Sequence, residues 1–113
     1  MIRSWQKILV PKLHVNGITL FPFILIRTEH LQADPVFLQH EHIHLRQQLE
    51  MGILPFYVAY LLHYAINRIK RMDHDTAYRN ICFEREAYAQ ERTAGYLKKR
   101  SVWNWIHYLA KRQ

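Results

Sequence analysis

The stretch DPVFLQHEHIHLRQQLEMG, residues 34–52, decides the fold. Asp34 is a typical N-cap residue, Pro35 suits the first helical position, and Gly52 suits the residue after a helix end. These signals predict a helix over residues 35–51. The remaining elements are expected to pack around it.

The predicted helix carries a His-Glu-x-x-His motif formed by His40, Glu41 and His44. Residues four apart lie on one face of a helix, so the two imidazoles can hold one metal ion. Glu41 points about 100° away, towards the side of a metal-bound water, and is expected to act as general base. Catalytic zinc usually takes three protein ligands. Glu50 would lie about 15 Å from His40 along a continuous helix, so the third ligand must come from another element.

That third ligand is predicted on a later helix, over about residues 78–96, which carries Glu84 and Glu86. At about 100° per residue, Glu86 shares its side with polar residues, which indicates a solvent face. The residues that share the face of Glu84 are Ile81, Ala87, Tyr88, Glu91 and Gly95. Periodicity therefore favours Glu84 as the inward carboxylate, with Glu86 as the alternative third ligand.

The motif His40-Glu41-x-x-His44, followed by Glu84-x-x-Ala87-Tyr88, resembles the gluzincin-type zinc metallopeptidases. In several of those families the third ligand is a glutamate in a Glu-x-x-Ala-Asp pattern on a later helix. The resemblance implies one zinc ion held by His40, His44 and Glu84, with Glu41 as the catalytic carboxylate. It is greatest to very small, single-domain zincin-like members, in which a short antiparallel sheet packs on an active-site helix and a ligand-bearing helix. Tyr88 stands where those families have an aspartate that supports the site.

A second group of residues is expected to support the ligands or to stabilise an oxyanion. Its members are Gln47, Tyr88, His63 and His74. Gln47 lies one turn beyond His44 on the ligand face, where plain packing is the alternative role. An extended peptide substrate is expected to pair with an edge strand over residues 23–26.

The rest of the chain predicts an α+β fold. Asn16-Gly17 between apolar residues favours a two-residue turn, and the resulting antiparallel ribbon should end where Pro11 faces Pro22. The second helix, apolar nearly all round, is expected to be buried, with an aromatic stripe in the core. The full expectation is one domain over residues 1–113, with a β ribbon at about 7–28 and helices at about 35–51, 54–70, 78–96 and 101–111.

Composition narrows the class of protein. The chain of 113 residues has 16 Lys and Arg against 9 Asp and Glu, and its apolar content excludes a disordered chain. A lone cysteine, Cys82, excludes a disulfide framework and a cysteine-based zinc site. No apolar stretch reaches the roughly 20 residues of a membrane span, nor is there a secretory signal, so the expected location is the cytoplasm.

The basic residues gather mainly in the runs 68–71, 98–100 and 111–112. A solvated surface is the expectation for them, without nucleic acid, while contact with a membrane surface stays open. A peptide or protein substrate of a zinc peptidase is the leading hypothesis. The alternatives are a zinc-binding protein with weak or no catalysis that acts in regulation or partner binding, and a basic helical module for nucleic acid or acidic lipid in which the histidine motif is accidental.

Overall fold

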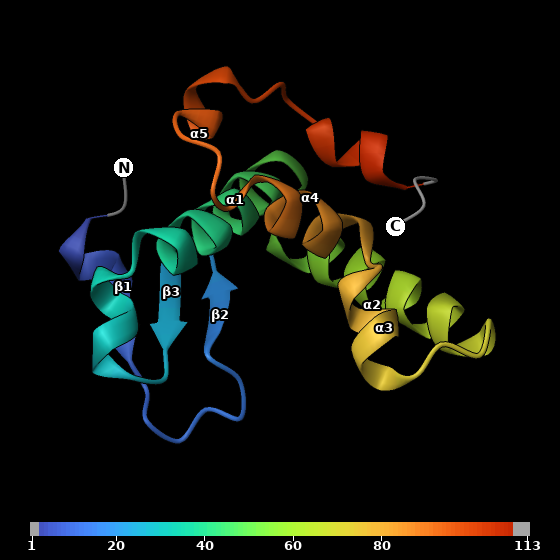
Figure 1. The fold of residues 1–113 in the computed structure, drawn as a ribbon, viewed down its shortest axis with the longest axis horizontal. Helices are drawn as coiled ribbons and strands as arrows, with labels where there is room; N and C mark the ends of the chain where they lie inside the picture. Colours follow the sequence, from blue (N-terminus) through green and yellow to red (C-terminus); the bar gives the residue numbers. More distant parts are fainter. Residues whose placement is uncertain (1–2, 110–113) are drawn as a thin grey trace.

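A computed structural model describes residues 3–109 and confirms the α+β class: a three-stranded sheet lies on one side of a group of helices (Figure 1). In chain order the elements are the 3₁₀ helix η1 (Ser4–Gln6), strands β1 (Lys7–Leu9), β2 (Gly17–Leu20) and β3 (Phe23–Ile26), the 3₁₀ helix η2 (Glu29–Ala33), helices α1 (Pro35–Met51), α2 (Ile53–Ile69), α3 (His74–Arg79), α4 (Cys82–Gln90) and α5 (Tyr96–Lys99), and the 3₁₀ helix η3 (Asn104–Tyr108).

The sheet is mixed, so the predicted wholly antiparallel ribbon is wrong. Its strand order is β1-β3-β2, with β1 parallel and β2 antiparallel to β3. Because β3 is the central strand, residues 23–26 cannot accept an extended substrate, and that prediction is also wrong. The strand edge on the other side of β3 from β1 belongs to β2.

The predicted turn at Asn16-Gly17 is absent, since β2 already begins at Gly17 and the hairpin turns at residues 21–22. Tertiary contacts override the local turn signal. The backbone N–H of Arg27 donates to the Asn16 carbonyl at 2.9 Å. At Gly17, a Cβ would lie 2.6 Å from Cζ of Phe37, so glycine allows the strand to approach that ring closely.

Helix α1 has the predicted bounds, and the structure shows the expected caps. The Asp34 carboxylate accepts hydrogen bonds from the backbone N–H groups of Val36 at 2.9 Å and Phe37 at 3.3 Å. Gly52 ends the helix with a φ of 88°, a conformation that favours glycine. The apolar side of α1 packs on β3 through Leu45.

Helix α2 lies within one residue of its predicted bounds, but the expectation of a buried helix is wrong. Among its residues only Phe56 and Asn67 are buried. The aromatic stripe is in the core as predicted, because Phe56 packs with Tyr57, Tyr60 and Tyr64 in one apolar cluster. The opposite side of α2 is open to solvent.

Within residues 3–109, no single helix has both the length and the apolar character needed to cross a membrane. The consecutive pair α1 and α2 meets the length and composition test only when taken together, and it is bent by 112°.

The single third helix predicted over residues 78–96 is wrong: that range contains the end of α3, the whole of α4 and the first residue of α5. The Asn80 side chain donates to the Thr76 carbonyl at 2.8 Å, and Ile81 is extended, so the first break falls there. At the other end, the amide of Gln39 donates to the carbonyls of Gln90 at 2.8 Å and Thr93 at 2.7 Å. These side-chain bonds replace the ones that a continuing helix would make.

The fourth predicted helix, over 101–111, is the short 3₁₀ helix η3 instead, and residues 110–111 lie outside the described part of the chain. Its aromatic side chains cover α4 as expected. The Trp105 ring lies 4.9 Å from the Phe83 ring, centroid to centroid. Figure 1 shows η3 running beside α4.

Candidate metal centre

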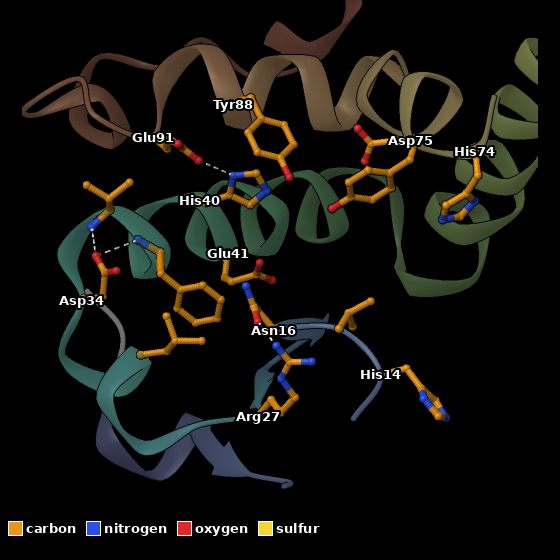
Figure 2. A pocket seen from close by; sticks show the side chains of 16 residues that line it. His14, Asn16, Arg27, Asp34, His40, Glu41, His74, Asp75, Tyr88 and Glu91 are labelled. Carbon is orange, nitrogen blue, oxygen red and sulfur yellow. Dashed lines mark hydrogen bonds and ion pairs between the residues drawn. The ribbon is translucent and has the colours of Figure 1, made fainter. Parts of the chain in front are cut away.

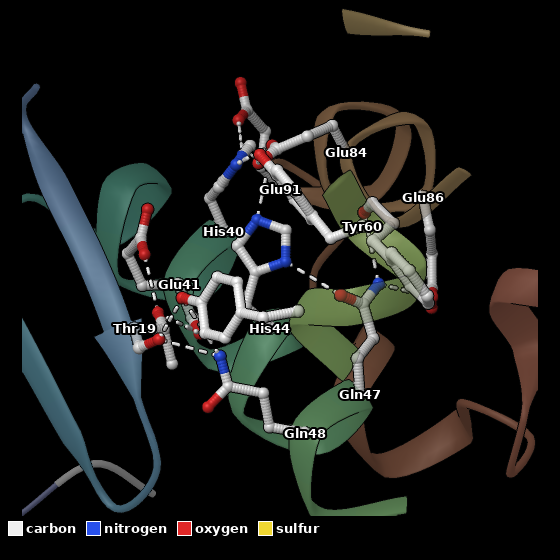
Figure 3. Close-up of polar contacts among 12 residues, drawn as sticks. Thr19, His40, Glu41, His44, Gln47, Gln48, Tyr60, Glu84, Glu86 and Glu91 are labelled. Carbon is white, nitrogen blue, oxygen red and sulfur yellow. Dashed lines mark hydrogen bonds and ion pairs between the residues drawn. The ribbon is translucent and has the colours of Figure 1, made fainter. Parts of the chain in front are cut away.

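Helices α1 and α4 pack side by side and bring three potential ligands to one point (Figure 3). One ligand atom from each of His40, His44 and Glu84 lies within 4.8 Å of the other two, and all three residues are buried. Oε1 of Glu84 is 3.0 Å from Nε2 of His40 and 3.2 Å from Nε2 of His44. The set is the one predicted from the sequence.

Nδ1 of each imidazole, the ring nitrogen that faces away from the common point, contacts an oxygen acceptor. Oε1 of Glu91 lies 2.7 Å from Nδ1 of His40, and Oε1 of Gln47 lies 2.7 Å from Nδ1 of His44. An acceptor at Nδ1 keeps a proton on that nitrogen, so each imidazole, in its neutral form, would present the lone pair of Nε2 to the common point. Both histidines are therefore arranged as ligands through Nε2.

The orientation of the Gln47 amide is fixed by its own partners. Its NH₂ group donates to the Phe83 carbonyl at 3.1 Å and to Oε1 of Glu86 at 3.0 Å. The amide oxygen must then face His44, where it accepts the hydrogen bond from Nδ1. Gln47, a predicted supporting residue, thus lies where that role places it.

The donor set fits a zinc ion. Nε2 of His44 is buried, and no polar group of the described residues lies in hydrogen-bond geometry to it, although Oε1 of Glu84 is close. Three acceptors that converge in a buried site require a positive charge between them. Two imidazoles and one carboxylate, with room for a fourth ligand, are typical of catalytic zinc.

The electrostatics of the site agree with this requirement. Burial disfavours a charged imidazole, but the Glu84 carboxylate outweighs burial and raises the pKa of His44 to about 9. Burial also disfavours a charged carboxylate, but His44 and then His40 outweigh it and hold the pKa of Glu84 well below its usual range. Without a metal the cluster therefore retains a proton.

A tyrosine on α2 completes the surroundings of Glu84. The Tyr60 hydroxyl donates to Oε2 of Glu84 at 2.5 Å. Burial, and next the carboxylate, raise the pKa of Tyr60 far above its usual value, so the hydroxyl keeps its proton. This bond occupies Oε2 and leaves Oε1 directed at the two imidazoles.

Glu41, the predicted general base, lies beside the ligands against the edge strand. Its Oε1 accepts a hydrogen bond from the Thr19 hydroxyl at 2.6 Å, which ties the carboxylate to β2. Glu41 lines two hollows: a cleft of about 640 Å³ that also includes His40 (Figure 2), and a pocket of about 270 Å³ that includes His44. The carboxylate therefore stands at the boundary between the ligand cluster and open space.

The remaining predicted site residues differ in their positions. Tyr88 packs its ring on His40, 4.5 Å between centroids, and lines the cleft. His74 lies on the cleft wall, where the Tyr64 hydroxyl contacts its Nδ1 at 2.8 Å. His63 is away from the cluster, since its Nδ1 accepts from the backbone N–H of Cys82 at 3.1 Å.

Glu86, the alternative third ligand, is fully buried, so the predicted solvent face is wrong. Its Oε1 accepts from Gln47 and from Nη2 of Arg100 at 3.0 Å, and its Oε2 accepts from Nε of Arg100 at 2.5 Å. Arg100 also bonds to Glu50. Glu86 thus belongs to a buried ion-pair network behind the site, and the nearest site residue it reaches is Gln47.

Sequence reasoning missed three contributors: Glu91, Tyr60 and Thr19. Glu91 carried a detectable signal, because it shares the helical face of Glu84 and lies two turns further along. Tyr60 followed the aromatic stripe and was assigned to the core alone. Thr19 could not be found, because its contact with Glu41 depends on how the sheet packs on α1.

Comparisons of this chain with protein-family models, curated proteins and solved structures give no match. The case for a function therefore depends on the geometry of the site.

Proposed function

We propose that this protein is a zinc-dependent peptidase of the zincin-like type, with His40, His44 and Glu84 as ligands. The observation that carries the proposal is the convergence of these three buried acceptors next to Glu41, at the wall of an open cleft. Without a metal, a retained proton offsets the charge of the buried carboxylate; a divalent ion would take its place and bind all three acceptors.

A zinc ion held there would supply Lewis acidity, which polarises a peptide carbonyl and acidifies a water. The chain supplies the proton transfers. Thr19 engages Oε1 of Glu41, which leaves Oε2 as the oxygen that accepts a proton from water and passes it to the leaving amine. Tyr88, His63 and His74 are the candidates for stabilising the oxyanion, and of these Tyr88 is the one whose ring contacts a ligand residue, His40.

The shape of the hollows suggests how a peptide would bind. The larger cleft and the smaller pocket are both lined by Glu41 and by Gly17, the first residue of β2. The smaller pocket has aromatic walls from Phe56, Tyr57 and Tyr60. A peptide lying along β2 would therefore place an apolar side chain in this pocket.

The test is cleavage of a mixed peptide library by zinc-loaded protein, with Glu41→Gln as the decisive variant. This change keeps the size of the side chain and the three ligands but removes the base. We expect cleavage to fall by at least about 100-fold while zinc content stays the same. Glu29→Gln, which changes the same charge on an exposed residue, is the matched control. Cleavage that survives in Glu41→Gln would refute the mechanism.

A further inference from the structure

Helix α2 has two unlike faces. Its inner face packs Phe56 into the core and carries Tyr60 to Glu84. At about 100° per residue, a second set of residues falls within an arc of about 100° on the opposite side. This outer face is defined by Leu54, Val58, Leu61, Leu62, Ala65 and Ile69.

The outer face is exposed along the helix. The exposed fraction is 74% for Leu54, 62% for Leu61 and 80% for Ile69. A helix of 17 residues is about 25 Å long, so this is a continuous apolar strip and not a scatter of single residues. Apolar strips of this kind mark contacts with a partner or a membrane.

The charges beside the outer face distinguish between a protein partner and a membrane. Arg68 borders the outer face, Lys70 and Arg71 follow directly at the helix end, and all three are exposed. No acidic residue occurs between Glu50 and Asp73. A second copy of α2 would therefore offer these cations no acidic partner, whereas lipid phosphates and carboxylates would.

We propose that the outer face of α2 lies in the interface of an anionic lipid bilayer, with the helix parallel to the membrane plane. The leucines would enter the acyl boundary, while Arg68, Lys70 and Arg71 meet the headgroups. The C-terminal half of α2 is at the end of the molecule away from the sheet (Figure 1), so the sheet does not cover this surface. This proposal does not depend on zinc binding or on peptidase activity.

The test is flotation of the purified full chain with vesicles of equal parts phosphatidylcholine and phosphatidylserine, and with phosphatidylcholine vesicles alone. We expect at least about tenfold stronger binding to the anionic vesicles, weakened by salt, because each basic residue near such a surface contributes about fivefold. Failure to bind the anionic vesicles would overturn the proposal.

Two pairs of variants test whether binding depends on the outer face itself or only on the overall hydrophobicity and net charge of the protein. Leu61→Glu should weaken binding more than about tenfold, while Val102→Glu, the same kind of change at another exposed apolar residue, should not. The double variant Arg68→Glu/Lys70→Glu should lose binding, whereas Lys98→Glu/Lys99→Glu, with the same change in net charge, should keep it. Equal losses within either pair would overturn the proposal.

The oligomeric state provides an independent check. Sedimentation equilibrium without lipid should show a monomer, because a second copy of α2 offers no acidic residue to the basic residues beside the outer face. A stable dimer that Leu61→Glu dissociates would overturn the proposal and assign this face to a second copy of the chain. Circular dichroism of each variant confirms that the fold is kept, since the changed residues are exposed.

Discussion

Replacement of Glu91 tests whether the imidazole of His40 is held as a metal ligand. Oε1 of Glu91 is 2.7 Å from Nδ1 of His40, and its side chain is 19% exposed, so the contact is largely shielded from water. Loss of an acceptor that orients a ligating histidine typically weakens metal binding by about 10- to 100-fold, or about 1.4 to 2.8 kcal/mol.

The two possible substitutions should differ within that range. Glu91→Gln keeps an oxygen acceptor and loses only the charge, so we expect zinc affinity to fall by about tenfold. Glu91→Ala removes the acceptor and frees the ring, so the loss should approach about 100-fold. Competition between metal-free protein and a chromophoric zinc chelator measures both values at one pH, with Glu29→Gln as the control for a changed surface charge. An affinity of Glu91→Ala within about twofold of the unmodified protein would refute the proposed role of Glu91.

Three further predictions concern stability. Gly17→Ala should lower the free energy of unfolding in urea by about 1–3 kcal/mol, because the new Cβ meets the Phe37 ring; an unchanged value would mean that the strand does not approach this ring. Glu86→Ala should cost about 3–5 kcal/mol, because Arg100, whose side chain is 1% exposed, keeps one of its two carboxylate partners; a neutral change would contradict the buried network. The third prediction concerns pH, with a chelator present to remove metal. Because Glu84 raises the pKa of His44 to about 9, the charged imidazole should stabilise the fold fully below pH 6.5 and lose this effect as the pH rises through about 9. The melting temperature should therefore fall between these pH values, and a rise would contradict the pairing of His44 with Glu84.

Local signals predicted the parts of the fold that depend on neighbouring residues. The bounds of α1 follow from Asp34 and Gly52, which act within one turn of the residues they cap. Helical periodicity selected Glu84 as an inward carboxylate, because small and apolar residues share its face of the helix. Both inferences hold without knowledge of the tertiary structure.

The errors arose where distant residues decide the outcome. The turn signal at Gly17 was overridden by close contact with a ring on α1. Glu86 is buried because Arg100, fourteen residues later, folds back to neutralise it, and periodicity within one helix carries no information about that partner. The outer face of α2 was assigned to the core because apolar content alone cannot distinguish a buried helix from one that is exposed on one side.

The zinc content of tag-free protein, measured by mass spectrometry after removal of loosely bound metal, tests the central claim most directly. The arrangement of His40, His44 and Glu84 predicts close to one zinc ion per chain, lost in His40→Ala and Glu84→Ala and retained in Glu29→Gln. Protein that binds no zinc, or binds it equally well after Glu84→Ala, would contradict the claim that these three side chains form a metal centre.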